Sequence, residues 1–356
     1  MSSESEKSHK PQRKRRRHST PIPDWDDSER HYRVILGESL TSRFKVMRLL
    51  GEGTFGKVVE CWDRKRKRYV AVKIIRAVDR YREAAFTEMD ILNDIADGDP
   101  SGRSGCVTLL TWFDFRGHLC MVFERWGPCL YDVIKNNRYQ PFPIYIIRSF
   151  ARQLCHSIAY LHSINLIHTD LKPENILLED DQFRVLPPDQ NSTHPLHLPV
   201  RPNIVLIDFG GATFNDKHHT SIVSTRHYRA PEVILDLGWT FPCDVWSIGC
   251  ILVEFYTGTA LFQTHRNAEH LAIMEKVLGP LPHEMIQKSK YYQDGELKWM
   301  DSANPSSLKY VESCSPMPDM IHDEDFLDLI LKMLTYDTKK RITAREALRH
   351  PFLNCN

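Results

Sequence analysis

The chain has 356 residues, of which 42% are hydrophobic and 26% charged, with a formal net charge of +1 at pH 7. This is the composition of a globular protein long enough for one large domain or two modest lobes. No apolar run approaches the roughly 20 residues of a membrane helix, and the charged N-terminus lacks the apolar region of a secretory signal. The nine cysteines include no C-x-x-C pair, so we expect reduced thiols in an intracellular protein.

Residues 1–27 are predicted to form a disordered basic tail, and residues 28–43 an N-terminal extension. The tail is rich in Ser, Lys, Arg and Pro and cannot bury enough surface to offset chain entropy. Residues 1–18 contribute +5 to the total charge of +1, which leaves −4 for the rest. The run Arg13–Arg17 has three interpretations, namely a nuclear import signal, a nucleic-acid contact and a solvated tail.

A small β-rich lobe is predicted over about residues 44–124, because short β-branched runs such as 58–62 and 69–75 are bounded by glycines or charges. Its glycines fit the pattern G-x-G-x-x-G-x-V, in which missing side chains let backbone N–H groups approach phosphates. A Rossmann site is disfavoured because a strand follows the glycines, and no P-loop pattern occurs. The predicted nucleotide contacts are Leu50, Gly51, Glu52, Gly53, Thr54, Phe55, Gly56, Lys57 and Val58.

Lys73 and Glu88 are predicted to form an ion pair in this lobe. Strand alternation places Lys73 on the same face as Ala71, beneath the glycines, where its ammonium can meet the α- and β-phosphates. Glu88 follows fifteen residues later on a helix predicted near residues 82–95, with Glu83 as the other candidate partner. Both residues are therefore assigned to the nucleotide site.

The nucleotide base is expected at the end of the β-rich lobe. The apolar run 119–123 ends at Phe123, which we place both in the core and behind the adenine, and Glu124 to Trp126 offer backbone groups to the base. Beyond residue 140 the pattern is mostly helical, with stripes at 146–161, 244–256 and 326–334. The second lobe, about residues 125–353, should be larger and α-rich.

A carboxylate, an ammonium and an amide lie within His168-Thr169-Asp170-Leu171-Lys172-Pro173-Glu174-Asn175, and Asp208-Phe209-Gly210 follows. We predict that Asp170 accepts a hydrogen bond from a substrate hydroxyl and that Lys172 contacts the transferring phosphoryl group. Asn175 and Asp208 are predicted magnesium ligands, because hard divalent cations prefer oxygen. A polar turn with no catalytic role is the alternative interpretation.

Three further features of the second lobe are predicted to be structural. Residues 179–203 contain five prolines between two apolar runs and are expected to form an inserted loop or hairpin. Glu232, which ends Ala230-Pro231-Glu232, should form a buried pair with Arg341. Asp244 should hold the backbone of the segment around Asp170.

These motifs, in this order, resemble the eukaryotic protein kinase family over about residues 44–353. The resemblance implies an α+β bilobal fold, with one main helix in the small lobe, and the use of ATP and Mg²⁺. The segment Glu269–Gly279 is similar to the E-H-L-A-M-M-E-R-I-L-G signature of the LAMMER, or CDC-like, kinases and departs from it at Ile273, Lys276 and Val277. The segments 168–170, 224–229 and 238–244 match the same branch.

The LAMMER resemblance implies a dual-specificity kinase that phosphorylates Ser or Thr in arginine/serine-rich splicing proteins, can also act on Tyr, and works in the nucleus, with the cytoplasm as a second location. One alternative is an inactive scaffold, which is disfavoured because Lys73, Asp170 and Asp208 are all present. The other is an RNA-associated docking protein that works through the basic tail. We expect a monomer with no membrane partner and no required nucleic-acid role.

Thr169 stands where most kinases have an arginine that pairs with a phosphorylated residue of the activation segment. Because threonine carries no charge, we hypothesise that activity does not require phosphorylation of that segment. Gly211, directly after Asp208-Phe209-Gly210, is a small-residue variant that should loosen the backbone locally.

Overall fold

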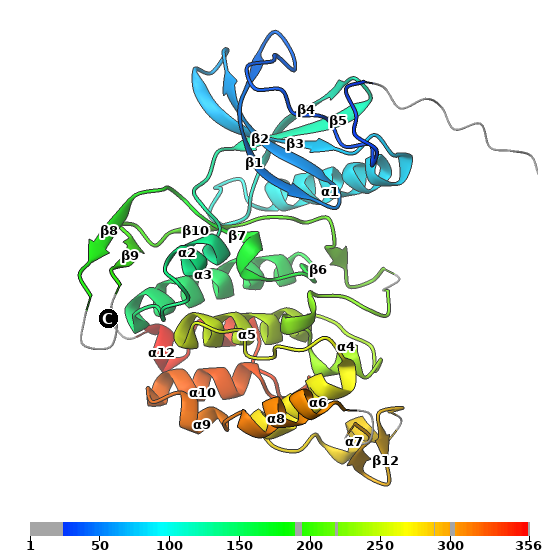
Figure 1. Cartoon of the computed structure of the whole chain (residues 1–356), viewed down its shortest axis with the longest axis vertical. Coiled ribbons are helices and arrows are strands. Elements are labelled where there is room, and N and C mark those ends of the chain that lie inside the picture. The colour runs from blue at the N-terminus through cyan, green and yellow to red at the C-terminus, as the bar shows by residue number, and fades with distance from the viewer. Residues whose placement is uncertain (1–23, 189–193, 218–219, 288, 300–302, 355–356) are drawn as a thin grey trace, which may run out of the picture.

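The computed structural model describes residues 24–188, 194–217, 220–287, 289–299 and 303–354. They form a sheet-rich lobe stacked on a larger helical lobe (Figure 1), so the predicted bilobal α+β fold is confirmed. Residues 1–23, which contain most of the predicted tail and the run Arg13–Arg17, lie outside the described residues. Within the described ranges, no helix has both the length and the apolar character needed to cross a membrane.

The small lobe is built on five antiparallel strands in the order β1-β2-β3-β5-β4. In β3, the branched side chains of Val70, Val72 and Ile74 are buried, whereas Ala71 and Lys73 alternate with them and are only partly buried. The period of two therefore turns Ala71 and Lys73 toward the other face of the sheet. The strands are β1 Phe44–Gly53, β2 Gly56–Asp63, β3 Arg68–Ile75, β4 Leu109–Phe115 and β5 His118–Glu124.

Helix α1, Asp79–Gly98, packs against β3, β4 and β5. Its buried residues recur at intervals of three and four, as expected of a helix with one face on a core. The helix predicted near residues 82–95 is confirmed and is longer at both ends. Glu88 lies on the buried face, so an acidic side chain is carried into the contact between helix and sheet.

The predicted end of the tail at residue 27 is placed too late, because the chain is already folded there. Asp26 is 1% exposed, and its carboxylate lies 2.8 Å from Nε2 of the buried His118. Nδ1 of the same ring lies 2.7 Å from the carbonyl oxygen of Ile75. A polar segment is thus held by a partner 92 residues away, which composition alone does not reveal.

The centre of the helical lobe is formed by α3, Ile144–Ser163, and α5, Pro242–Thr257, which pack against each other. Every residue of α5 from Cys243 to Phe255 is buried, in keeping with its long apolar sequence. The helical stripes predicted at 146–161, 244–256 and 326–334 coincide with α3, α5 and α10. The other helices are α2 Leu130–Asn136, α4 Pro231–Ile234, α6 Asn267–Leu278, α7 His283–Ile286, α8 Pro305–Ser313, α9 Met317–Met320, α10 Glu324–Met333, α11 Ala344–Ala347 and α12 Pro351–Asn354.

Short strands and 3-10 turns connect these helices and carry the loops that face the small lobe. The antiparallel pairs are β7 with β10 and β6 with β11 near the lobe junction, and β12 with β13 farther away. Their bounds are β6 Leu166–Ile167, β7 Ile176–Leu178, β10 Ile204–Leu206, β11 Thr213–Phe214, β12 Tyr292–Gln293 and β13 Glu296–Leu297, with turns η1 Pro173–Asn175 and η2 Arg226–Tyr228.

The insertion predicted over residues 179–203 contains a β-hairpin, β8 Phe183–Leu186 paired with β9 Leu196–Pro199. Leu198 is fully buried, and the Asn137 side chain joins the backbone of His197 through two hydrogen bonds of 2.8 Å. The hairpin is therefore attached to the helical lobe on the outer side of α2 (Figure 1). Residues 189–193 lie outside the described part of the chain.

Candidate active site

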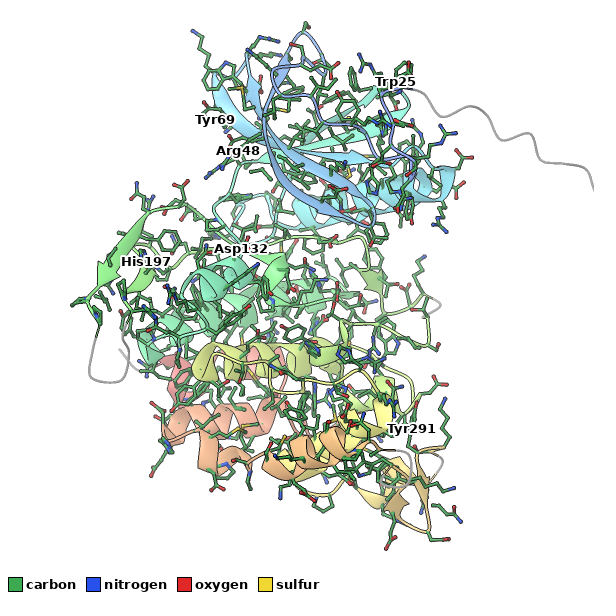
Figure 2. All side chains as sticks on the ribbon, viewed as in Figure 1. Trp25, Arg48, Tyr69, Asp132, His197 and Tyr291 are labelled. Carbon is green, nitrogen blue, oxygen red and sulfur yellow. The ribbon has the colours of Figure 1, made fainter. Side chains whose placement is uncertain are left out.

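A cavity of about 830 Å³ lies between the two lobes. Asp132, on α2, lies at the upper edge of the helical lobe, where that lobe faces the sheet (Figure 2). Thr54 and Lys57, although predicted, do not line the cavity: the carbonyl of Thr54 accepts from Arg76, and the ammonium of Lys57 lies 3.4 Å from Glu52. The predicted residues that do line it are Leu50, Gly51, Glu52, Gly53, Phe55, Gly56, Val58, Lys73, Glu88, Phe123, Glu124, Trp126, Asn175 and Asp208.

The roof of the cavity is the turn between β1 and β2. A Cβ at Gly51 or Gly53 would have no neighbouring atom within 4 Å, so the backbone there is open to a ligand. Gly56 differs, because a Cβ at that position would lie 2.1 Å from the carbonyl oxygen of Ile74. Two of the three glycines thus leave space for phosphates, while the third lets β2 approach β3.

Lys73 contacts acidic side chains from both lobes, Glu88 of the small lobe and Asp208 of the helical lobe. Its Nζ donates to both carboxylate oxygens of Glu88 at 2.8 Å and lies 3.6 Å from Oδ1 of Asp208. Burial disfavours the ammonium, but Glu88 and Asp208 overcome this cost and raise the pKa of Lys73 above its ordinary value. The predicted pair with Glu88 is formed, and the lysine is charged in a position where it can meet phosphate oxygens.

Asp170 and Lys172, although predicted, do not line the cavity; Asp170 lies five residues before Asn175, which does, and is fixed by two neighbours. Lys172 Nζ donates to its Oδ2 at 2.7 Å, and Thr225 donates to Oδ1 through its backbone N–H at 2.8 Å and its hydroxyl at 2.7 Å. Burial opposes ionisation, yet these hydrogen bonds keep the pKa of Asp170 below its usual value. The aspartate is therefore a carboxylate at neutral pH, able to accept a proton or a hydrogen bond from a hydroxyl.

Asn175 and Asp208 present oxygen atoms to the same cavity. Asn175 Nδ2 donates to the carbonyl of Asp170 at 2.9 Å, which leaves its Oδ1 as the free end of the amide. Asp208 has a backbone φ of 65° and a side chain 35% exposed. One carboxylate and one amide oxygen fit a hard divalent cation that keeps part of its water shell.

Asp244, on α5, holds the loop that carries Asp170. Its carboxylate accepts from the backbone N–H groups of His168 and Thr169, both at 2.9 Å, and lies 3.0 Å from His162 Nε2. Burial opposes the charge, but hydrogen bonds and charge from His162 and His168 hold the pKa of Asp244 below its ordinary value. The predicted scaffold contact is thus formed.

Thr169 adopts a backbone φ of 71°, which is uncommon for a β-branched residue. Three hydrogen bonds hold it there: its N–H donates to Asp244, its hydroxyl donates to the carbonyl of Gly211 at 2.8 Å, and its carbonyl accepts from Ser224 at 2.7 Å. A Cβ at Gly211 would lie 3.1 Å from the Thr169 hydroxyl. The small residue at 211, expected to loosen the backbone, instead permits this close contact.

Glu232 and Arg341 form the predicted buried pair. The two guanidinium nitrogens of Arg341 meet the two oxygens of Glu232 at 2.7 and 2.9 Å, and both side chains are almost fully enclosed. Arg341 also donates to the carbonyls of Thr335 and Pro242. The pair ties α4 to the C-terminal part of the helical lobe, away from the cavity.

Several cavity residues were not predicted. Ala71, Val107, Leu177 and Ile207 supply apolar surface, and Glu174 supplies an acidic group; Asp132, a candidate from the sequence for ribose or basic-residue contact, also lines the cavity. Ala71 could have been found from its alternation with Lys73 in β3, and Leu177 and Ile207 from their places next to the metal-binding candidates. Nothing near Val107 in the sequence signals its position.

Comparison with known proteins agrees with this geometry. The protein kinase domain family matches residues 44–353. The chain is 49% identical over 351 residues to the serine/threonine-protein kinase AFC3 of Arabidopsis thaliana, covering 94% of this chain and 87% of that protein. It is 48% identical to the human dual specificity protein kinase CLK1, covering 92% and 69%. The crystal structure of the PF14_0431 kinase domain superposes with a TM-score of 0.86 at 38% identity, covering 92% of this chain and all of that one.

Proposed function

The chain belongs to the protein kinase family and to its LAMMER branch, and from this premise we propose that it transfers the γ-phosphate of ATP to Ser and Thr, and to Tyr, in arginine/serine-rich splicing proteins. As a member of this family it is an enzyme that uses ATP and a divalent cation and acts on proteins. The observation that carries the proposal is the convergence of Lys73, Asn175 and Asp208 on one cavity from three separate segments, with the Asp170 carbonyl bonded to the Asn175 side chain.

Asp170 and Lys172 perform the chemical roles on the helical side. The Asp170 carboxylate accepts a hydrogen bond from the substrate hydroxyl and orients its oxygen toward the phosphoryl group, and takes up the proton as transfer proceeds. The Lys172 ammonium, 2.7 Å from that carboxylate, stabilises the charge on the transferring oxygens. Lys73, held by Glu88, neutralises the remaining phosphates. These residues act by position and charge and form no covalent intermediate.

Asn175 and Asp208 are the proposed Mg²⁺ ligands, since their oxygens line the cavity beside Lys73. The cation supplies charge neutralisation between phosphate oxygens when bound. The end of the cavity near Phe123, Glu124 and Trp126 would hold the base, and the turn at Gly51 and Gly53 would cover the phosphates.

Substrate class, location and oligomeric state are part of the proposal. The charge of −4 outside the first 18 residues favours basic substrates. The run Arg13–Arg17 supports nuclear import, with the cytoplasm as a second location, and we propose a monomer. An inactive scaffold is disfavoured because the residues that such proteins lose, Lys73, Asp170 and Asp208, are present and each forms an ion pair. An RNA-associated role of the tail is compatible with the kinase.

We further propose that activity does not depend on phosphorylation of the activation segment. Thr169, Ser224 and Thr225 already join the catalytic loop to that segment by hydrogen bonds, so no phosphate is required to order it. Enzyme treated with a phosphatase should keep its turnover. A large loss would refute this part of the proposal.

The first experiment measures transfer from labelled ATP with Mg²⁺ to an Arg-Ser repeat peptide and to a neutral Ser peptide. Wild type should prefer the repeat peptide, and Asp170→Asn should lose about 10² to 10⁴ in rate because the hydrogen-bond acceptor is weakened. Equal rates on both peptides would remove the substrate claim, and no transfer by wild type would favour the scaffold.

A further inference from the structure

The tip of the turn between β1 and β2 is bonded to a residue from outside that turn. Gly53 and Gly56 pair with each other, so Thr54 and Phe55 form the tip. Arg76, the first residue after β3, donates from Nη1 to the carbonyl of Thr54 at 3.1 Å, and its backbone N–H donates to the carbonyl of Phe55 at 3.0 Å. Residue 76 thus bonds both carbonyls of the tip.

The same guanidinium also bonds the N-terminal segment, residues 24–33, which precedes β1. Its Nε donates to the carbonyl of Glu29 at 2.9 Å, and its Nη2 donates to the same oxygen. The side chain of Arg76 is only 14% exposed. A guanidinium can join two carbonyls in this way because it is planar and its five N–H donors point in fixed directions. Arg76 therefore connects the tip of the turn to the N-terminal segment.

Asp27 fixes the loop that presents the Glu29 carbonyl. Its Oδ1 accepts from the backbone N–H groups of Glu29 and His31, both at 2.9 Å. Its Oδ2 lies 3.7 Å from Nζ of Lys57, the second residue of β2. One carboxylate thus orders the loop behind Arg76 and contacts the strand that leaves the turn.

The tip of the turn also contacts helix α1. The rings of Phe55 and Tyr81 meet edge to face with their centroids 5.6 Å apart, and the Arg76 guanidinium lies 5.0 Å from the centroid of the Tyr81 ring. Helix α1 also carries Glu88, which bonds Lys73. The turn, the N-terminal segment and the helix that orients Lys73 therefore meet at Arg76.

The turn needs such a restraint because its own packing is loose. Phe55 is 49% exposed, and a Cβ at Gly53 would meet no atom within 4 Å. Backbone N–H groups bind phosphates well only when they are already held in position. The N-terminal segment is a firm anchor, since Asp26 is buried and bonded to the buried His118.

We propose that Arg76 is a positioning residue that, anchored on the N-terminal segment, holds the β1–β2 turn over the phosphates of the nucleotide. The inference rests on the proposed function, in which this turn covers the phosphates. Within the described part of the chain Arg76 does not line the cavity, so it acts through Thr54 and Phe55 and not on the nucleotide itself. The N-terminal segment thereby contributes to nucleotide affinity.

The test compares the inhibition constants of ADP and adenosine, both measured against ATP in phosphate transfer with Mg²⁺. Adenosine lacks the phosphates, so the preference for ADP over adenosine isolates phosphate binding and cancels any change that both ligands share. In Arg76→Ala this preference should fall by about fivefold to tenfold, because the tip loses its restraint. Arg76→Lys keeps the charge but not the planar fork and should recover only part of the preference. Arg66→Ala removes an exposed arginine of the same lobe and should match wild type.

A second substitution tests the part played by the N-terminal segment. Asp27→Ala frees the loop that presents the Glu29 carbonyl and should lower the preference for ADP by about twofold to fivefold. Asp27→Asn keeps an acceptor for the two backbone N–H groups and should lie closer to wild type. In the double variant with Arg76→Ala, the effect should be smaller than the product of the two single effects, because both substitutions break one connection.

The outcomes separate the inference from the proposed function. If wild type transfers phosphate and prefers ADP, an unchanged preference in Arg76→Ala shows that the inference is wrong while the proposed function stands. Full recovery in Arg76→Lys would assign the effect to charge alone, and fully independent effects of Arg76→Ala and Asp27→Ala would remove the N-terminal segment from the explanation. A wild type that transfers no phosphate would refute the proposed function and the inference with it.

Discussion

The two walls of the cavity are built in opposite ways. On the helical side, Asp170, Thr169 and Asp244 are each held by two or three hydrogen bonds. On the sheet side, Leu50 and Phe55 are 41% and 49% exposed, and a Cβ added at Gly51 or Gly53 would meet no atom within 4 Å. The proposed catalytic residues are thus fixed in advance, while the turn proposed to cover the nucleotide is more exposed.

The largest expected effect comes from breaking the buried pair that supports the helical side. Arg341→Ala leaves the Glu232 carboxylate enclosed without its partner and should lower the free energy of unfolding by about 3–5 kcal/mol, measured by urea denaturation. Its neighbour Lys340, which pairs with Asp337 on the surface, provides the control, and Lys340→Ala should change little. Equal effects of the two substitutions would contradict the role given to the buried pair.

Burial of the Glu254 carboxylate lowers the free energy of unfolding, and the amount by which it does so depends on pH. Its folded-state pKa of about 7 lies above the ordinary 4.5, so the folded protein holds an extra proton between these values and stability falls as pH rises from about 4.5 to 7. Glu254→Gln removes the titrating group. The free energy of unfolding of this variant should therefore exceed that of wild type by about 3 kcal/mol at pH 8 and by little at pH 4.5. Unfolding by urea at both pH values measures this. A difference independent of pH would show that Glu254 is not the titrating group.

Two glycines on the sheet side allow an open position to be compared with a closely packed one. Gly56→Ala drives a Cβ into the carbonyl of Ile74 and should cost about 1–3 kcal/mol of unfolding free energy. Gly53→Ala meets no atom within 4 Å and should stay within about 0.5 kcal/mol. Thermal unfolding of the two variants measures both values. If Gly53→Ala were as damaging as Gly56→Ala, the sheet side would not be open.

The smallest expected effect concerns the contact between Thr169 and Gly211. Thr169→Val keeps the shape of the side chain but removes the hydroxyl that donates to the Gly211 carbonyl, and should cost about 1 kcal/mol of unfolding free energy. Thr169→Ser keeps the hydroxyl and should recover part of the loss, as chemical denaturation of the three proteins would reveal. A Ser variant no more stable than the Val variant would remove the hydrogen bond from the explanation.

The elements that sequence predicted best are those whose residues lie close together along the chain. The strand pattern around Lys73 and the helical spacing around Glu88 place both side chains without knowledge of the rest, and the structure joins them at 2.8 Å. The segment from His168 to Asn175 is equally compact. The end of the tail was misplaced because Asp26 is stabilised by His118, a contact that no local pattern encodes.

By itself, the sequence determined the bilobal fold, the family and most of the residues that line the cavity, because periodicity and short motifs are local properties. Only the tertiary structure brought Glu254 beside Glu174, although 80 residues separate them in the sequence. In the chain Glu254 is one of two acids in a largely apolar helix. Its raised pKa arises from burial and from the nearby charge of Glu174, both of which depend on how the whole lobe packs.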